Sequence, residues 1–421
     1  MARTKRKRRE ETPLLREETH VIFLGAGASF NSGYPIGEKL RLRLCSREHF
    51  ERDLRAVVFG SLGEQERVLR AAECTNLMNV YLKHFDGFHS STELFRHGCF
   101  GTVDEFSRLA AAKYPEQVQD MKRLMRLAFS FNNPEEQFQE SDYYPFVQRL
   151  FEEDLCSLRS DITVLSYNYD CYLDFLLLKA NRLRRQLSGA SEVANYEKNT
   201  LTSGFFDTSY IKDEHANHGF NYLKLHGGIA YPEGKDFSFA TLFDPDIRKR
   251  IPMTFAGYKA TSVPPIVFPW ELFDESDNFI SENDFVYVKQ SKTAEERKEA
   301  KALFKVYESI WKTARQVVLR ATKVSFVGLS MHPFMETGLA YLFRRKTGAP
   351  QVVVANTVEV ESLCKRLGVL LRTVAPDMEA RGSLIDERAR MAVESGRLRY
   401  PIYGMTPRSS FRDFIEKEMN F

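Results

Sequence analysis

Polar side chains of types used in catalysis follow two apolar, strand-like runs of the sequence. Asn168 and Asp170 end the run 162–170, and His226 lies between an apolar run and a pair of glycines. An amide can orient a hydroxyl group, and an imidazole with a pKa near about 6.5 can accept a proton at neutral pH. A helix cap is the favoured role for Asp170 taken alone. Asn168 and His226 are therefore the candidates for general-base chemistry, and a packed core histidine is the structural alternative at 226.

A glycine-rich turn follows the first strand-like run, HVIFL at 20–24. The turn, GAGAS, contains Gly25, Ala26, Gly27 and Ser29. Glycines allow close backbone approach, so such a turn can place N–H groups and a helix N-terminus against a pyrophosphate. Phe30 stands where the dehydrogenase fingerprint has its third glycine, and no acidic residue closes a second strand about twenty residues later. The Walker pattern is also absent, so the sequence argues against a hydride-transfer enzyme and a P-loop NTPase.

Two later strand-like runs also end in small or amide residues. The run 323–330 ends in Gly328 and Ser330, and the run 351–356 ends in Asn356. Hydroxyl and amide groups at strand ends suit ribose hydroxyls and phosphates. Each motif alone is more typical of a plain turn, so these residues indicate a site only through their order along the chain.

Short apolar runs alternate with helical patterns over most of the chain. The strand-like runs lie at 20–24, 162–170, 222–228, 264–269, 323–330 and 351–356. Between about 48 and 154, apolar residues recur three or four positions apart, which is typical of amphipathic helices. Continuous apolar strands alternating with helices predict an α/β fold, with a Rossmann-type parallel sheet covered by helices on both faces. The carboxyl ends of parallel strands are where such sheets bind ligands.

The same patterns divide the chain into four parts. We expect a basic, disordered tail at 1–19, a Rossmann-type core at 20–47 and 155–375, a helical insertion at 48–154 and a C-terminal appendage at 376–421. The insertion is a candidate for a lid or an oligomer contact, and a packing layer over the sheet is the alternative.

Composition excludes several classes of protein. The 421 residues carry 60 Lys and Arg against 57 Asp and Glu, and 43% are hydrophobic, as in an ordinary folded soluble protein. The six cysteines include no C-x-x-C pair, which argues against a zinc ribbon and fits a reducing cytoplasm. No run of about 18 apolar residues is present, so we expect no membrane span and a cytoplasmic location. Six of the first ten residues are basic and could bind nucleic acid, although a solvated tail is the favoured interpretation.

Taken in order, these motifs resemble those of the sirtuin-like family. The order is GAGAS, Asn-x-Asp at 168–170, Leu-His-Gly at 225–227, Gly-x-Ser at 328–330 and a strand ending in Asn356. TVDEF at 102–106 and PPIVFP at 264–269 also look like family sequence. The resemblance covers residues 20–45 and 160–370. It looks closest to divergent bacterial members that act as NAD+ hydrolases in antiphage defence.

The resemblance implies two groups of site residues. The catalytic pair would be Asn168, which orients water or a ribose hydroxyl, and His226, which acts as the base. The other motif residues would bind NAD+, with the glycine-rich turn at the pyrophosphate, Asp170 near the nicotinamide and Asn356 at the adenosine ribose. This second set comprises Gly25, Ala26, Gly27, Ser29, Asp170, Gly328, Ser330 and Asn356.

Two departures from the family pattern favour NAD+ cleavage over protein deacylation. Deacylating sirtuins carry a four-cysteine zinc module, which this chain lacks. They also follow the glycine-rich loop with Asp-Phe-Arg, where this chain has Ile36-Gly37-Glu38. The expected activity is therefore a NAD+ glycohydrolase that releases nicotinamide and ADP-ribose, with NAD+ as its substrate and no metal. The alternatives are an NAD-dependent protein deacylase and a non-catalytic regulatory subunit that binds NAD or ADP-ribose.

An enzyme of this kind would drain a central cofactor, so we expect its activity to be regulated. By analogy with the family, control would come from a homo-oligomer or from a separate partner. The resemblance implies a hexameric translocase-type ATPase or a phage-derived activator as such a partner.

Overall fold

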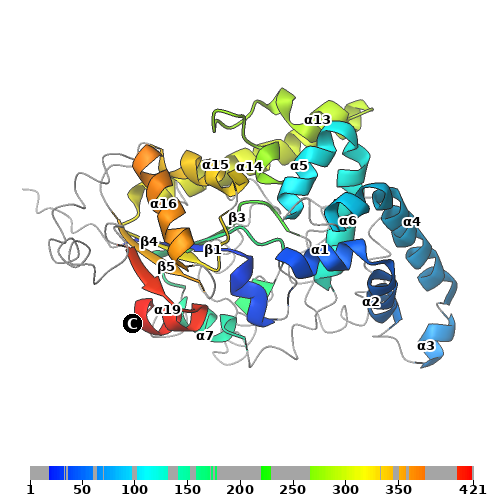
Figure 1. Ribbon diagram of the computed structural model, residues 1–421, viewed down its shortest axis with the longest axis horizontal. Helices are drawn as coiled ribbons and strands as arrows, with labels where there is room; N and C mark the ends of the chain where they lie inside the picture. Colours follow the sequence, from blue (N-terminus) through cyan, green and yellow to red (C-terminus); the bar gives the residue numbers. More distant parts are fainter. Residues whose placement is uncertain are drawn as a thin grey trace, which may run out of the picture.

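A parallel sheet with helices on both faces organises the described part of the chain (Figure 1). The computed structural model describes residues 19–32, 34, 37–59, 64–69, 71–96, 102–130, 141–151, 158–170, 172–173, 176–177, 220–228, 266–331, 333–344, 350–356, 360–374 and 405–419. The expected basic tail, except for Thr19, and residues 376–404 of the expected appendage lie outside these ranges.

Six strands form one sheet in the order β3-β2-β1-β4-β5-β6, and all the pairings between them are parallel. The strands are β1 (His20–Leu24), β2 (Ile162–Ser166), β3 (Asn221–Lys224), β4 (Lys323–Val327), β5 (Gln351–Ala355) and β6 (Met405–Arg408). His20 is in register with Ile162 on one side of β1 and with Lys323 on the other. The prediction of an α/β fold with a Rossmann-type parallel sheet is confirmed.

Two expectations about individual strands are wrong. The described part of the run 264–269 is not a strand of the sheet. Ile266 makes only an isolated antiparallel bridge with Gly227, and the short 3-10 helix η3 (Pro269–Glu271) begins directly afterwards. Conversely, β6 was not expected as a strand, because MTPR is short and contains Pro407. A proline is tolerated there because β6 is at the edge of the sheet, where one side of the strand needs no ladder bonds.

Apolar side chains point to both faces of the central strand. In β1, Ile22 and Leu24 pack into one buried cluster, whereas Val21 and Phe23 pack into a second cluster. Neighbouring residues of a strand point to opposite faces, so these two clusters are the two sides of the sheet. A strand that is apolar on both faces needs helices on both faces, which explains the three-layer arrangement.

Helices from the second half of the chain cover the face that contains Val21 and Phe23. They are α13 (Val286–Gln290), α14 (Ala294–Arg320), α15 (Pro333–Phe343) and α16 (Val360–Val374), and the short 3-10 helix η4 (Glu282–Asp284), which buries no residue, precedes them. A capping box between Thr293 and Glu296 begins α14, and this helix buries Trp311 against the sheet. In Figure 1, α14, α15 and α16 lie on the opposite side of the sheet from α19 (Phe411–Glu418).

The chain between β1 and β2 is mainly helical in its described parts. Its helices there are the 3-10 helix η1 (Ala26–Ser32), α1 (Gly37–Cys45), α2 (Arg47–Phe59), α3 (Glu64–Leu69), α4 (Ala71–Arg96), α5 (Val103–Lys113), α6 (Pro115–Ser130) and α7 (Tyr143–Arg149). We call α1 to α6 the helical layer, because they lie together beside the sheet in Figure 1. The Thr102 side chain caps α5 by accepting the backbone N–H of Glu105 at 3.2 Å, which fixes the residue at which this helix begins.

Candidate functional site

Residues that follow four parallel strands line a single cavity of about 100 Å³. The strand order reverses between β1 and β4, and open α/β sheets bind ligands at such a point. Six of the predicted site residues line this cavity, namely Ala26, Ser29, Asn168, Asp170, His226 and Ser330. Whole-ligand sites usually measure about 300–1,000 Å³, so this cavity is smaller than a site that encloses a whole ligand.

Ser29 connects the two polar residues that follow β2. Its Oγ donates to Asp170 Oδ2 at 2.8 Å and accepts from Asn168 Nδ2 at 3.0 Å. The Tyr143 hydroxyl of α7 lies 3.2 Å from Ser29 Oγ and 3.4 Å from Asn168 Nδ2. Asp170 also accepts the backbone N–H of Tyr172 through Oδ1 at 3.0 Å, which is the capping contact expected for it. Asp170 thus combines a local cap with a long-range contact that positions the amide of Asn168.

The amide oxygen of Asn168 is available to a ligand. Asn168 is 5% exposed and lines the cavity, and its backbone N–H donates to Ser166 Oγ at 3.1 Å. Its Oδ1 makes no hydrogen bond with any described residue. Buried amide oxygens nearly always have a partner, so an acceptor of this kind at a cavity wall suits a ligand hydroxyl or a water molecule.

His226 is held with one ring nitrogen against a backbone carbonyl. The side chain is 1% exposed, and Nδ1 lies 3.0 Å from the carbonyl oxygen of Val267. A carbonyl only accepts, so the neutral imidazole carries its proton on Nδ1 and its lone pair on Nε2. The ring packs near Tyr167 and Trp311, with centroid distances of 5.1 and 5.7 Å. The Trp311 indole N–H donates to the carbonyl of Leu225 at 3.0 Å and so fixes the backbone just before His226.

The two glycines of the first turn pack against the turn that follows β4. A Cβ on Gly25 would lie 2.6 Å from the Gly328 carbonyl oxygen, and a Cβ on Gly27 would lie 2.8 Å from the same atom. The Gly27 N–H donates to that carbonyl at 2.8 Å, and Ala28 N donates to Gly25 O at 2.9 Å. Close approach of two backbones therefore accounts for these glycines. Ala26 lines the cavity, whereas Gly25 and Gly27 do not. Contact of this turn with a pyrophosphate remains a prediction.

Asn356 lies behind the β4 turn, outside the cavity lining. Its Nδ2 donates to the carbonyl of Leu329 at 2.9 Å, and its backbone N–H donates to Arg408 O at 3.2 Å. Asn356 therefore supports the loop that carries Gly328 and Ser330 and ties it to β6. Its predicted contact with an adenosine ribose remains a prediction.

The helical layer contributes residues to the cavity that the catalytic motifs did not identify. Thr102, Val103 and Asp104, at the start of α5, form part of the cavity wall. Asp104 Oδ1 accepts the Tyr169 hydroxyl at 2.9 Å. Burial, together with the nearby Asp104 carboxylate, holds the pKa of Tyr169 well above its usual range, so this hydroxyl stays a donor. The only sequence signal for this wall is the phrase TVDEF.

No protein-family model and no curated protein matches this chain. Within the described residues, no group of three or more His, Cys, Asp or Glu is arranged to hold a metal ion. Among the helices that the structure describes, none is long and apolar enough to cross a membrane.

Proposed function

We propose that this chain is a NAD+ glycohydrolase related to the sirtuin-like family. The observation that carries the proposal is that Asn168 and His226, which follow different strands, line one cavity beside the glycine-rich turn. The strand order, with its reversal between β1 and β4, is also that of dinucleotide-binding sheets. We choose NAD+ over other nucleotides as the substrate because the order of the sequence motifs resembles that of the sirtuin-like family.

The reaction would break the bond between the nicotinamide nitrogen and ribose C1′. The electron pair of that bond goes to nicotinamide, which leaves as a neutral molecule and needs little help from an acid. A water oxygen forms the new bond to C1′ through a transition state that resembles an oxocarbenium ion. The products are nicotinamide, ADP-ribose and one proton.

Each side chain has a defined part in this mechanism. His226 Nε2 takes the proton from the attacking water or from a ribose hydroxyl, while Nδ1 stays bonded to the Val267 carbonyl. Asn168 Oδ1 accepts a hydrogen bond from the same water or hydroxyl and orients it. General-base catalysis of this kind is worth about 10²–10⁴-fold in rate. The carboxylates of Asp104 and Asp170 add negative charge to a cavity that would receive the cationic end of NAD+.

Incubation with NAD+ and chromatography of released nicotinamide tests the proposal. The wild-type chain should release nicotinamide and ADP-ribose in equal amounts, and His226→Ala and Asn168→Ala should each lower the rate by about 10²-fold or more. Bound but unreacted NAD+ would indicate the regulatory-subunit alternative, and deacylation of an acetyl-lysine peptide would indicate the deacylase. A folded His226→Ala variant with the wild-type rate contradicts the proposal.

The resemblance extends the proposal to biological context. We propose a regulated, NAD-depleting effector of bacterial antiphage defence that works as a homo-oligomer or with a separate activator. Light scattering of the purified chain, with and without NAD+, tests the oligomeric part of this proposal.

A further inference from the structure

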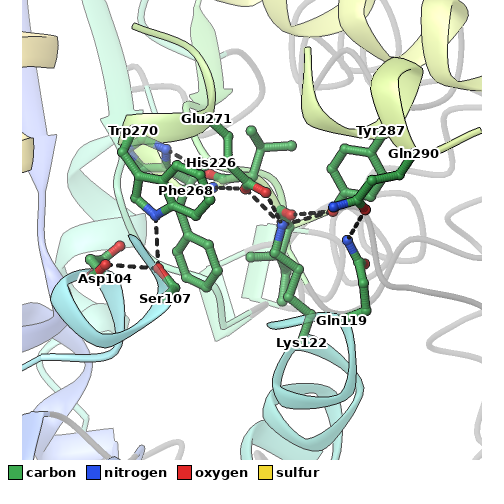
Figure 2. A network of polar contacts seen from close by, with 12 residues as sticks. Asp104, Ser107, Gln119, Lys122, His226, Phe268, Trp270, Glu271, Tyr287 and Gln290 are labelled. Carbon is green, nitrogen blue, oxygen red and sulfur yellow. Dashed lines mark hydrogen bonds and ion pairs between the residues drawn. The ribbon is translucent and has the colours of Figure 1, made fainter. Parts of the chain in front are cut away.

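A buried ion pair joins the helical layer to the chain segment that contacts His226 (Figure 2). Lys122 lies on α6 and Glu271 lies in η3, and the two residues are 0% and 3% exposed. The Lys122 ammonium donates to both oxygens of Glu271, at 2.7 and 2.6 Å. It also lies 4.8 Å from the ring centroids of Phe268 and Tyr287, so its charge is surrounded by the carboxylate and two aromatic faces.

This ion pair holds the backbone on both sides of one residue. On one side, Glu271 Oε2 accepts the backbone N–H of Phe268 at 2.7 Å. On the other side, Lys122 donates to the Tyr287 hydroxyl at 2.8 Å, and that hydroxyl donates to the carbonyl of Ile266 at 3.0 Å. The Lys122 ammonium thus fixes the two peptide groups that flank Val267, one through the Glu271 carboxylate and the other through the Tyr287 hydroxyl.

The residue between these two peptide groups is the one that binds the histidine. Val267 donates its N–H to the carbonyl of His226 at 3.1 Å, and its own carbonyl accepts from His226 Nδ1 at 3.0 Å. The position of the Val267 carbonyl decides which ring nitrogen of His226 carries the proton. A displaced carbonyl would remove this constraint on the tautomer and on the orientation of the ring.

Stability alone does not account for this ion pair. Desolvation lowers the pKa of Lys122 and raises the pKa of Glu271, so burial opposes the charged form of both groups. Replacing a buried ion pair by residues of similar volume is often neutral or stabilising. What the pair provides in this structure is a fixed position for the Ile266–Phe268 backbone.

We propose that Lys122 is a positioning residue for the catalytic site, acting through Glu271 and Tyr287 to hold the Val267 carbonyl and keep the His226 proton on Nδ1. The proposal rests on the proposed function, because it assigns His226 as the base. It also assigns the helical layer a role at the site, because Lys122, which would hold the His226 tautomer, lies on α6.

The test uses a double variant in which both charges are removed and the volumes are nearly kept, Lys122→Met with Glu271→Gln. Nitrogen-15 NMR of labelled histidine reports the tautomer directly, and the His226 signals are identified by their loss in His226→Gln. The wild-type chain should show the Nδ1–H form, and the double variant should show a mixture of tautomers. Its kcat for nicotinamide release should fall by up to about 100-fold while KM changes little.

The matched control is Lys323→Met with Glu418→Gln. These residues form an ion pair of 2.9 Å at the amino end of β4, away from the cavity. The control should keep both the His226 tautomer and the wild-type kcat. Tyr287→Phe keeps both charges and removes only the bridge to Ile266, so it should give a smaller tautomer shift even if the double variant fails to fold.

Two results distinguish a failure of the positioning role from a failure of the proposed glycohydrolase function. An unchanged Nδ1–H signal in a folded double variant and in Tyr287→Phe overturns the positioning role, whatever the activity. A shifted tautomer in a chain that never releases nicotinamide supports the positioning role and overturns the glycohydrolase assignment.

Discussion

At the scale of single residues, one serine hydroxyl forms hydrogen bonds with both polar residues that follow β2. Ser29 donates to Asp170 and accepts from Asn168, so it transmits the position of a buried carboxylate to the amide that would orient water. Asn168 and His226 could be selected from the sequence because each follows an apolar run directly. Ser29 could be selected only as part of its turn, and its contacts span 139 and 141 residues.

Replacing Ser29 by alanine should damage the site more than the fold. The variant loses a hydrogen bond to a buried carboxylate, which costs about 1.5–3 kcal/mol in the free energy of unfolding. The Asn168 amide also loses its shorter acceptor contact and keeps only the one to the Tyr143 hydroxyl at 3.4 Å. The rate of nicotinamide release should therefore fall at least tenfold, which corresponds to about 1.4 kcal/mol in activation free energy. Denaturant unfolding and chromatography measure the two effects.

Ser32→Ala is the matched control for this substitution. Ser32 lies in the same 3-10 helix and is buried, but its hydroxyl bonds to Ser141 at 2.7 Å. Its loss should lower stability by about 1 kcal/mol and leave the rate unchanged. Equal losses of rate in both serine variants would argue against a specific role for Ser29.

At the scale of elements, two strand-end turns are built around one another. Gly328 has φ of +63°, and a Cβ there would lie 2.2 Å from the backbone nitrogen of Ala28. The turns after β1 and β4 can therefore meet only if both are made of glycine at the point of contact. The sequence predicted both glycine-rich turns and their place after strands, but it could not show that they contact each other.

Gly328→Ala should destabilise the protein far more than Gly37→Ala. Both glycines have positive φ, but a Cβ on Gly37, at +44°, would meet nothing within 4 Å. The left-handed conformation alone costs about 1–2 kcal/mol with alanine, which is the loss we expect at Gly37. The backbone collision at Gly328 should raise the loss above about 3 kcal/mol. Urea unfolding of the two variants measures the difference, and equal losses would disprove the packing argument.

The sequence predicted elements well where the apolar pattern was continuous and poorly elsewhere. β1, β2, β4 and β5 are buried runs of β-branched and aromatic residues, and all were predicted. Residues 266–268, the described part of the run before η3, are also β-branched and aromatic. They lie outside the sheet, and Ile266 instead bridges to Gly227. The cavity wall from α5 could not be predicted, since helical periodicity shows which face of a helix is apolar but not which element it covers.

At the scale of the whole molecule, distant parts of the chain meet at the two ends of the sheet. At the carboxyl end, Ser107 of the helical layer accepts the Trp270 indole N–H at 2.7 Å, next to Pro269, which lines the cavity (Figure 2). At the amino end, the buried His20 ring contacts Phe414 of α19 at a centroid distance of 6.2 Å, and its Nε2 lies 2.7 Å from Ser325 Oγ. The carboxyl end contains the candidate site, and the amino end contains a buried histidine.

His20 should make the fold sensitive to acid. Desolvation, together with the positive charges of Lys323 and Arg159, lowers the pKa of His20 to about 3. Between pH 6.5 and about 3 the unfolded chain therefore binds a proton that the folded chain excludes, and stability falls as the pH falls. From pH 7 to pH 5 this group alone should lower the free energy of unfolding by about 2 kcal/mol.

Denaturant unfolding of wild type and His20→Gln at both pH values isolates this contribution. The variant has no imidazole to protonate, so its loss of stability from pH 7 to pH 5 should be smaller by the same amount. A parallel pH dependence in the two proteins would show that His20 is not responsible.

The most direct test of the central claim is a double-mutant cycle on nicotinamide release from NAD+. If Asn168 and His226 act on the same water or hydroxyl, removing either side chain disables the same step, and their effects are not additive. We predict that Asn168→Ala with His226→Ala is little slower than His226→Ala alone. Losses in kcat/KM that simply multiply in the double variant would contradict a shared site, and a single variant with the wild-type rate would remove that residue from the mechanism.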